Sequence, residues 1–458
     1  MSIVSLNQAA SGRSLLIRGG SVISMDARIG DLPSGDVHIR DGVIVDVAQQ
    51  LDVPDAEIID ASSMVVMPGF VDGHRHLWEG IVRNSLPNGD LGDYMRVIME
   101  GFAPALEPED AHLGTLVSAL GALDAGVTTV LDWSHIQTTP DHTAATIAAL
   151  RESGIRAVFA FGPPASQDRG HVYPLDVFRL KQEEFASNDQ LLTLGLATIS
   201  PEHAPDEVAR PNFELAREAD LLLTAHAGIS GFGQPNEIER YGKEGLLGPH
   251  VNLVHCNTLS ETEWSVIADT GTTVSITPSA EMQMGHGVPP IQQAVDAGVT
   301  PSLGVDVETS APGDMWTQMR LIFGLQRSNA LELHFAGKTA PELIDVDDVL
   351  RYATIGGATA ARLRDKVGTL TPGKQADVIL LRADMINVLP VNNLRSAVVH
   401  NMDARNVDTV IVAGRVVKQD GQLLGVDMAR LASEVYSGRE RVFTTAGQTH
   451  SRVTRRFV

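Results

Sequence analysis

Cysteine is nearly absent from this sequence, and its scarcity excludes a fold held together by disulfides. The 458 residues include one cysteine, Cys256, so the chain offers no partner for an internal disulfide bond. No run of apolar residues approaches the length of about 18 that indicates a membrane-spanning helix. The opening residues also lack the basic start and unbroken apolar core of a signal peptide. We therefore expect a cytoplasmic protein that has no membrane partner.

Positive charge is also scarce. Lys and Arg total 35 against 57 Asp and Glu, which gives a formal net charge of −22 with histidine neutral. A protein that binds nucleic-acid phosphates needs clustered cations, so this excess of negative charge argues against a nucleic-acid partner. Apolar residues make up 43% of the chain and charged residues 20%, which is enough for a substantial core and excludes a disordered protein. We expect a globular protein that acts on a small molecule.

The two ends of the chain share a pattern of short β-rich segments separated by Gly and Asp. Alternating apolar residues, with turn signals such as Asp41-Gly42 and Ala413-Gly414, predict antiparallel hairpins at both ends. The segments concerned are 14–26, 36–51, 374–384 and 407–421. We predict that the two ends pair with each other into a single β-sandwich.

The middle of the chain repeats a different unit, in which a short β-branched run precedes a helical stretch. The runs are 70–74, 127–132, 155–161, 191–198, 220–226, 251–256, 272–277 and 299–306. Amphipathic helices closed by a C-terminal Gly are predicted at 140–154 and 291–298. Eight such units favour an α/β fold of the (β/α)8 TIM-barrel type. A doubly wound open sheet is the alternative, although no glycine-rich dinucleotide turn follows the first strand.

These patterns divide the chain into three predicted parts. Residues 68–365 form the barrel, residues 1–67 and 366–425 form the composite β-sandwich, and residues 426–458 form a C-terminal helix and tail. The segment from Trp78 to Pro108 is too long for a simple turn, and loops of that length at a barrel mouth often wall a substrate site.

Histidines mark the candidate site. His74 and His76 are two residues apart on a predicted strand, so both imidazoles project to the same face. His226, His255 and Asp306 end three other predicted strands, where barrel enzymes place their active sites. Any one of them alone is more often a hydrogen-bonded core residue, but five convergent strand-end groups favour a site for one divalent ion. Zinc suits such ligands best, and iron, manganese or cobalt are alternatives. A metal ion lowers the pKa of its bound water to about 7, which points to hydrolysis.

The sequence resembles the amidohydrolase superfamily, specifically its cytosine deaminase and chlorohydrolase-like branch. The resemblance spans most of the chain, through the phrases PGFVDGHRH, HCNTLSETE and VGTLTPGKQADVILL. It implies a (β/α)8 barrel with a sandwich built from both termini, and commonly a homo-oligomer. It implies that His74, His76 and His226 bind the metal, with Asp306 binding the metal or its water and shuttling a proton. It also implies that His255 polarises the electrophile or orients the nucleophile.

One absence bears on the number of metal ions, and the chain departs from that branch at two places. No lysine follows the fourth strand, which favours one metal over two. Ring deaminases of the branch carry His-x-x-Glu after the fifth strand, whereas this chain has Ile229 in place of the glutamate, and isoleucine cannot transfer a proton. After the seventh strand Glu281 replaces an asparagine of the relatives. We hypothesise that Glu281 faces the pocket and carries a proton or binds a substrate N–H; a solvated loop carboxylate is the alternative.

Substrate contacts can also be ranked from the sequence. His203 aligns with a substrate-contacting histidine of the relatives, and Trp78 and Trp133 are candidate aromatic walls, although packing is the commoner role of tryptophan. Further polar residues near predicted strand ends rank below these. They are Asp132, His135, Glu202 and Glu308.

The leading hypothesis is a mononuclear metal hydrolase that cleaves a non-peptide C–N bond of a small molecule, such as an amide, urea, carbamate or amidine. An acyclic bond leaves its nitrogen near Asp306, so no separate ring-protonating glutamate is needed. The alternative is an aminohydrolase or chlorohydrolase acting on an N-heterocycle, with Glu281 as proton donor. A catalytically silent barrel used for binding is a third hypothesis, which the set of five metal-site candidates argues against.

Overall fold

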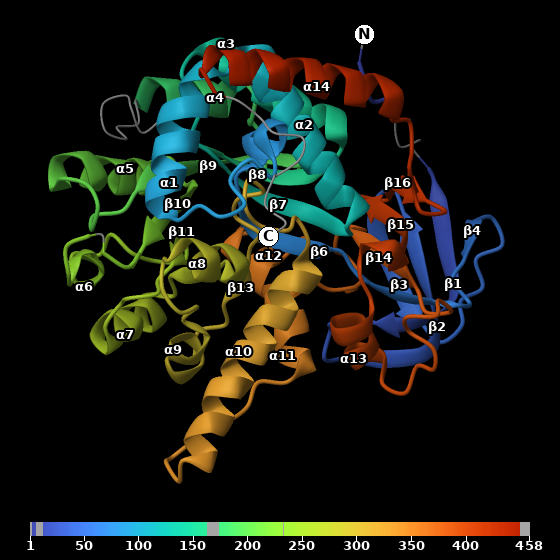
Figure 1. Cartoon of the computed structure of the whole chain (residues 1–458). Helices are drawn as coiled ribbons and strands as arrows, with labels where there is room; N and C mark the ends of the chain where they lie inside the picture. The colour runs from blue at the N-terminus through green and yellow to red at the C-terminus, as the bar shows by residue number, and fades with distance from the viewer. Residues whose placement is uncertain (1, 6–11, 163–173, 232, 449–458) are drawn as a thin grey trace, which may run out of the picture.

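The computed structural model describes residues 2–5, 12–162, 174–231 and 233–448. In this part of the chain the strands form two sheets, one of eight strands and one of nine. Figure 1 shows the nine-stranded sheet to one side of the barrel and the helices wrapped around the barrel. None of the described helices is long and apolar enough to cross a membrane.

The eight-stranded sheet is the barrel, and all its neighbouring strands pair in parallel. Its strands in order are β6 (Phe70–Arg75), β7 (Val127–Ser134), β8 (Arg156–Phe161), β9 (Leu192–Ile199), β10 (Leu222–Ala227), β11 (Val251–His255), β12 (Thr273–Ile276) and β13 (Ser302–Leu303). The circle closes where Asp306 N donates to His74 O at 2.8 Å and His76 N donates to Asp306 O at 3.1 Å. The predicted (β/α)8 barrel is confirmed.

Helices cover the barrel strands, which explains why those strands are apolar runs rather than alternating ones. The longer helices are α2 (Pro108–Asp124), α3 (Pro140–Ser153), α4 (Pro174–Glu183), α5 (Asp206–Glu218), α7 (Glu261–Thr270) and α10 (Met315–Phe335). Shorter ones are α1 (Leu91–Tyr94), α6 (Glu237–Lys243), α8 (Pro278–Met284), α9 (Ile291–Asp296), α11 (Val346–Arg351), α12 (Gly357–Ala360) and α13 (Leu394–Ser396). Helix α3 ends as predicted, at Gly154 with a φ of 74°.

The nine-stranded sheet combines the two ends of the chain. It contains β1 (Ser14–Ile23), β2 (Asp31–Arg40), β3 (Val43–Ala48), β4 (Glu57–Asp60), β5 (Met64–Pro68), β14 (Val378–Arg382), β15 (Val407–Val412), β16 (Arg415–Gln419) and β17 (Gln422–Leu423). Strand β5 pairs with β1 on one side and with β14 on the other. The two predicted turns are present, with positive φ at Asp41, Gly42, Ala413 and Gly414.

The predicted composite β-domain is therefore confirmed, and its strands are hydrogen-bonded into one continuous sheet. One face of the sheet encloses a separate apolar core, to which both ends of the chain contribute. Leu15 and Ile39 come from the first end, and Leu380 and Ile411 from the second. The domain boundaries stay a prediction.

A buried ion pair joins the nine-stranded sheet to the barrel. Arg156 of β8 binds Asp377 through two contacts, Nε to Oδ2 at 2.8 Å and the second guanidinium nitrogen to Oδ1 at 2.9 Å. Asp377 Oδ1 also accepts from Ala413 N, at 2.9 Å. The last helix, α14 (Met428–Thr445), packs on α2, where Arg441 contacts Asp110 at 2.7 Å. The tail beyond residue 448 lies outside the described residues.

Candidate functional site

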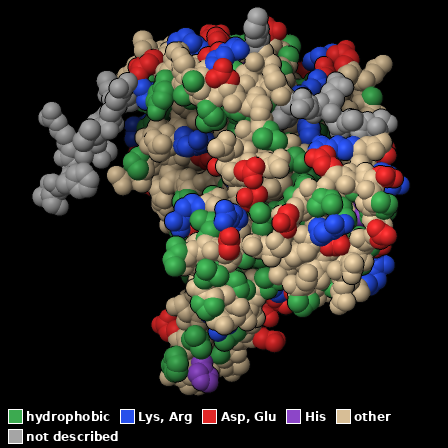
Figure 2. Space-filling model, turned by 90° about the vertical axis from the view of Figure 1, so that its right-hand side faces the viewer, with side chains coloured by type: hydrophobic (Ala, Val, Ile, Leu, Met, Phe, Trp, Pro, Cys, Tyr) green, Lys and Arg blue, Asp and Glu red, His purple; other side chains and the backbone are tan. Residues whose placement is uncertain are grey.

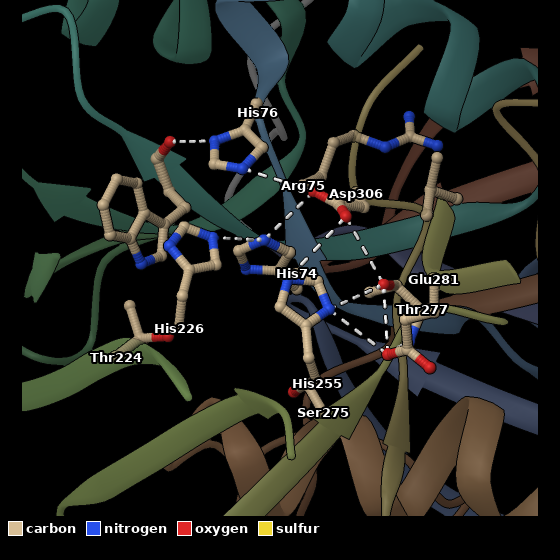
Figure 3. A network of polar contacts seen from close by, with 12 residues as sticks. His74, Arg75, His76, Thr224, His226, His255, Ser275, Thr277, Glu281 and Asp306 are labelled. Atoms are coloured by element: carbon tan, nitrogen blue, oxygen red, sulfur yellow. Dashed lines mark hydrogen bonds and ion pairs between the residues drawn. The ribbon is translucent and has the colours of Figure 1, made fainter. Parts of the chain in front are cut away.

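The five strand-end groups meet at one end of the barrel. His74 and His76 lie at the end of β6, His226 at the end of β10, His255 at the end of β11, and Asp306 just beyond β13. Figure 3 shows the imidazoles gathered around the Asp306 carboxylate. His255 and Asp306 have φ values of 78° and 69°, a region that side-chain-bearing residues seldom occupy and that is enriched at functional sites.

The close approach of β13 to β6 depends on a glycine. A Cβ on Gly304 would lie 2.8 Å from His74 O and 2.9 Å from His74 N. Any other residue at this position would push the strand away from the histidine pair. Gly304 therefore allows Asp306, two residues later, to reach the same point as His74.

The ring nitrogens of these histidines point at each other and at Asp306. Nε2 of His74 lies 3.2 Å from Nε2 of His226. Asp306 Oδ1 lies 3.3 Å from Nε2 of His74 and 3.3 Å from Nε2 of His76. Two overlapping groups of side chains have ligand atoms close enough together to hold a metal ion. One is His74, His76 and His226, and the other is His74, His255 and Asp306.

A contact on the far side of the His76 ring fixes its tautomer. Nδ1 of His76 lies 2.8 Å from the carbonyl oxygen of Trp133, so Nδ1 carries the proton and Nε2 is left with a lone pair. Burial lowers the pKa of His74 and of His255 to about 4, so both are neutral at pH 7. Lone pairs and a carboxylate that converge in this way repel one another unless a cation lies between them. The donor set fits a divalent metal ion.

A cavity of about 500 Å³ opens above this cluster, a size typical of small-molecule sites. Its apolar wall consists of Leu91, Tyr94, Met95, Met99, Trp133, Ile199, Ile229, Met284 and Val307. Its polar lining consists of His76, His135, Glu202, His203, His226, Gly233, Gln234, His255, His286 and Asp306. Among the described residues that line the cavity there is no Lys or Arg.

Two of the three ranked substrate contacts line the cavity. The ring of Trp133 lies 4.4 Å from that of His226, centroid to centroid. His203 lines the cavity with an Nε2 atom that has no protein partner. Trp78 is placed elsewhere, because its side chain is fully buried in the core and is not among the lining residues. It packs behind His135, and the centroids of the two rings are 5.5 Å apart. Trp78 is therefore not in a position to touch a substrate.

Glu281 also lies away from the pocket and is fully buried rather than solvated. Its Oε1 lies 3.2 Å from Nδ1 of His255 and accepts from Thr277 N at 2.7 Å, while Oε2 accepts from Asn257 Nδ2 at 3.2 Å. Burial raises the pKa of Glu281 to about 7. In its ionised form the carboxylate holds the proton of His255 on Nδ1. The structure thus supports a role for Glu281 in holding His255 rather than in contacting the substrate directly.

The remaining strand-end residues divide between the cavity and the core. His135 and Glu202 line the cavity, whereas Glu308 is buried against Arg83, 3.0 Å away. Asp132 accepts from Leu77 N at 3.1 Å and is not among the lining residues.

Sequence reasoning missed His286 and two methionines. His286 is buried, its ring centroid lies 4.5 Å from that of His255, and neither ring nitrogen has a protein partner. A histidine between Gly285 and Gly287, just after the seventh barrel strand, was the available signal. Met95 and Met99, which the sequence analysis does not single out, also line the cavity.

Comparisons with known proteins add three findings. The amidohydrolase family model matches residues 65–417. The 5-methylthioadenosine/S-adenosylhomocysteine deaminase of Acetivibrio thermocellus is 26% identical over 441 residues, covering 93% of this chain and 99% of the relative.

Two solved structures share the fold. One is an adenosine deaminase from Xanthomonas campestris with bound zinc, with a TM-score of 0.80 at 22% identity, covering 95% of this chain and 100% of that one. The other is an atrazine chlorohydrolase from Arthrobacter aurescens complexed with zinc, with a TM-score of 0.79 at 21% identity, covering 93% of this chain and 100% of that one.

Proposed function

The chain belongs to the amidohydrolase family, and from this we propose that it is a metal-dependent hydrolase that removes an amino group from an N-heterocycle. The observation that carries the proposal is the convergence of the Nε2 atoms of His74 and His76 on Asp306 Oδ1, at the floor of a cavity of small-molecule size.

We infer that His74, His76, His226 and Asp306 hold a single ion, and that the ion is zinc. Neutral imidazoles and a carboxylate are suitable zinc ligands, and both solved relatives named above contain zinc. A divalent ion at this place supplies Lewis acidity, which activates a water molecule and polarises the electrophilic carbon.

The protein's own groups handle the protons. Asp306 accepts a proton from the attacking water and later passes it to the leaving nitrogen. Nε2 of His255 lies 3.9 Å from Asp306 Oδ2, on the same side of the cluster. With its proton held on Nδ1 by Glu281, His255 has a lone pair on Nε2, so it orients the water by accepting a hydrogen bond.

The relatives favour the ring substrate over the acyclic one. Their names are those of deaminases and a chlorohydrolase that act on heterocycles. A cavity with an apolar wall and the flat Trp133 ring suits a planar heterocycle. The competing substrates in the test are the acyclic amide, urea, carbamate and amidine, together with the chlorinated ring.

We also propose a cytoplasmic homo-oligomer. The described cysteine is a buried free thiol, which suits a reducing compartment.

Helix α10 projects from the body, and hydrophobic side chains gather at its far end (Figure 2). Leu331 and Phe335 are 36% and 83% exposed there, and a second copy of the chain would cover them. Light scattering tests this; a monomer at micromolar concentration contradicts it.

Zinc analysis combined with a product screen tests the function. The zinc-loaded protein is assayed with adenosine and 5′-methylthioadenosine for ammonia, with chlorotriazines for chloride, and with simple amides and ureas. We expect ammonia from an amino-substituted ring. His74→Ala should lose zinc and activity, whereas His400→Ala, at an exposed position that does not line the cavity, should keep both. Turnover confined to acyclic substrates, or no turnover by fully loaded protein, overturns the proposal.

A further inference from the structure

The cavity contains a second carboxyl group. Among the described lining residues, Glu202 and Asp306 are the two carboxylic acids. Glu202 follows the end of β9, one strand away from His226 on β10, and is 8% exposed. Asp306 lies among the imidazoles at the cavity floor, whereas the described bonds of Glu202 are to backbone and hydroxyl groups at the side.

Contacts fix one oxygen of this carboxyl group. Oε2 of Glu202 accepts from Gly228 N at 2.8 Å and lies 3.4 Å from the hydroxyl of Ser200. The carbonyl oxygen of a carboxylic acid is its better acceptor, so these two donors favour Oε2 as the carbonyl oxygen and place the proton of a protonated Glu202 on Oε1. Gly228 is the neighbour of Ile229, so the carboxyl group lies in the same corner of the cavity as that apolar side chain.

The surroundings keep this group protonated near neutral pH. Burial raises the pKa of Glu202 to about 7, and the charges of Glu263 on α7 and Glu237 on α6 add to the effect. The adjacent His203 does not oppose it, because burial lowers the pKa of that imidazole. Gly233 allows the packing that closes this corner, since a Cβ there would lie 3.0 Å from Glu202 Cβ and 3.1 Å from the His203 ring.

The reaction needs a second proton carrier. Addition of water to a ring C=N bond moves an electron pair onto the ring nitrogen, which must take up a proton. Asp306 is occupied with the proton of the attacking water. Ile229 has no proton to give, and burial lowers the pKa of His286 to about 4, so that ring is neutral at pH 7.

Resting on the proposed function, we propose that Glu202 is the catalytic acid that protonates the ring nitrogen of the substrate. The substrate class is an uncharged heterocycle with an N=C–NH₂ edge, because the ring nitrogen of that edge can take the Oε1 proton while the neighbouring carbon bears the amino group that water displaces. The wall formed by Met95, Met99 and Leu91 accommodates an apolar substituent on the ring.

The proton transfers balance. Water bonds to the ring carbon that bears the amino group and gives one proton to Asp306, while Glu202 gives its proton to the ring nitrogen. Asp306 then protonates the amino group, the C–N bond breaks and ammonia leaves. The remaining hydroxyl proton passes to Glu202. The product carries C=O beside N–H, and Glu202 is again protonated.

Glu202→Gln in the zinc-loaded enzyme tests the proposal. We expect kcat to fall about 10²- to 10⁴-fold, the usual contribution of a general acid, with KM nearly unchanged. In the wild type kcat/KM should fall as the pH rises through about 7, and this decline should be missing from the variant. Glu207→Gln, on the exposed surface of α5, is the matched control and should behave as wild type. Zinc content, circular dichroism and the conservative variant Glu202→Asp show whether a loss of activity comes from misfolding.

A binding assay separates this proposal from the proposed function. Purine and 1-deazapurine differ by one ring nitrogen, and their binding can be followed by calorimetry. The wild type should prefer purine by about tenfold at pH 6, the worth of one hydrogen bond, and lose the preference at pH 8.5. Glu202→Ala should show no preference at either pH.

Each outcome is decisive. If the wild type deaminates rings and Glu202→Gln keeps its rate and pH profile, the acid role is overturned and the function stands. If no ring is deaminated but the pH-dependent preference depends on Glu202, the function fails and the ring-nitrogen contact stands. If neither turnover nor preference is seen, both are overturned.

Discussion

Oε1 of Glu281 lies 3.2 Å from Nδ1 of His255, and the carboxylate is outside the set of residues that line the cavity. The same oxygen accepts from Thr277 N, and the other accepts from Asn257. This arrangement makes Glu281 a positioning residue that sets the tautomer of His255.

Glu281→Gln should lower kcat/KM roughly 10- to 100-fold, as the loss of an orienting partner commonly does. The NH₂ group of the glutamine has to face a hydrogen-bond donor, either Thr277 N or Asn257 Nδ2. The side chain therefore holds the His255 ring less firmly. Zinc content should stay at the wild-type value, because none of the proposed ligands changes. Steady-state kinetics across pH provides the measurement, with Glu261→Gln on the exposed face of α7 as control. Unchanged turnover at every pH would remove Glu281 from the mechanism.

Metal removal should lower the thermal stability of the protein. A ligand that binds the native state alone adds about 2.7 kcal/mol at 100 times its Kd, so zinc should raise the melting temperature of chelator-treated protein. His74→Ala should show a much smaller rise, and His400→Ala the full rise. Differential scanning fluorimetry over a zinc series checks this. An equal rise in His74→Ala would place the ion elsewhere.

The stability of the protein should depend on the proton of Glu202. Burial raises the pKa of this carboxyl group from 4.5 to about 7, so the folded protein keeps a proton that the unfolded chain releases. The resulting stabilisation is complete below pH 4.5 and is lost as the pH rises through 7. Glu202→Gln should therefore gain stability over wild type between pH 5 and pH 8, by at most about 3 kcal/mol. Melting temperatures of both proteins from pH 4 to pH 8.5 measure the difference; a constant difference contradicts the expectation.

The barrel and the histidine cluster were predictable because each depends on short-range pattern. Apolar runs that end in a polar residue identify both the strand and its carboxyl end, which is how His226 and Asp306 could be placed together. Glu281 and Trp78 were not predictable in this way. Their direction depends on how α8 and the turn after β6 pack, and sequence spacing carries no information on that. Glu202 also follows a predicted strand, but the sequence does not show that it lines the same cavity as Ile229, the observation on which its proposed role rests.

The ion pair between Arg156 and Asp377 should contribute strongly to the attachment of the two sheets. Both side chains are nearly inaccessible, at 2% and 1%, so Asp377→Ala leaves a buried guanidinium unpaired and should cost about 3–5 kcal/mol. Urea unfolding followed by circular dichroism measures the loss. The exposed pair Arg382 and Asp384 is the control, and Asp384→Ala should cost less than about 1 kcal/mol. The double replacement Arg156→Met with Asp377→Leu should recover part of the loss, since it removes the unpaired charge. Equal effects of the two alanine variants would contradict this assignment.

The position of β5 has a consequence for the order in which the protein can form during synthesis. This strand is flanked by β1, which is made before it, and by β14, whose last residue is Arg382. On the ribosome, one edge of β5 therefore stays without its native partner while some three hundred further residues emerge. The barrel strands can assemble in sequence as they appear, but the sheet at the termini must wait. Nascent chains that stop before residue 382 should expose this edge and be the ones that chaperones retain.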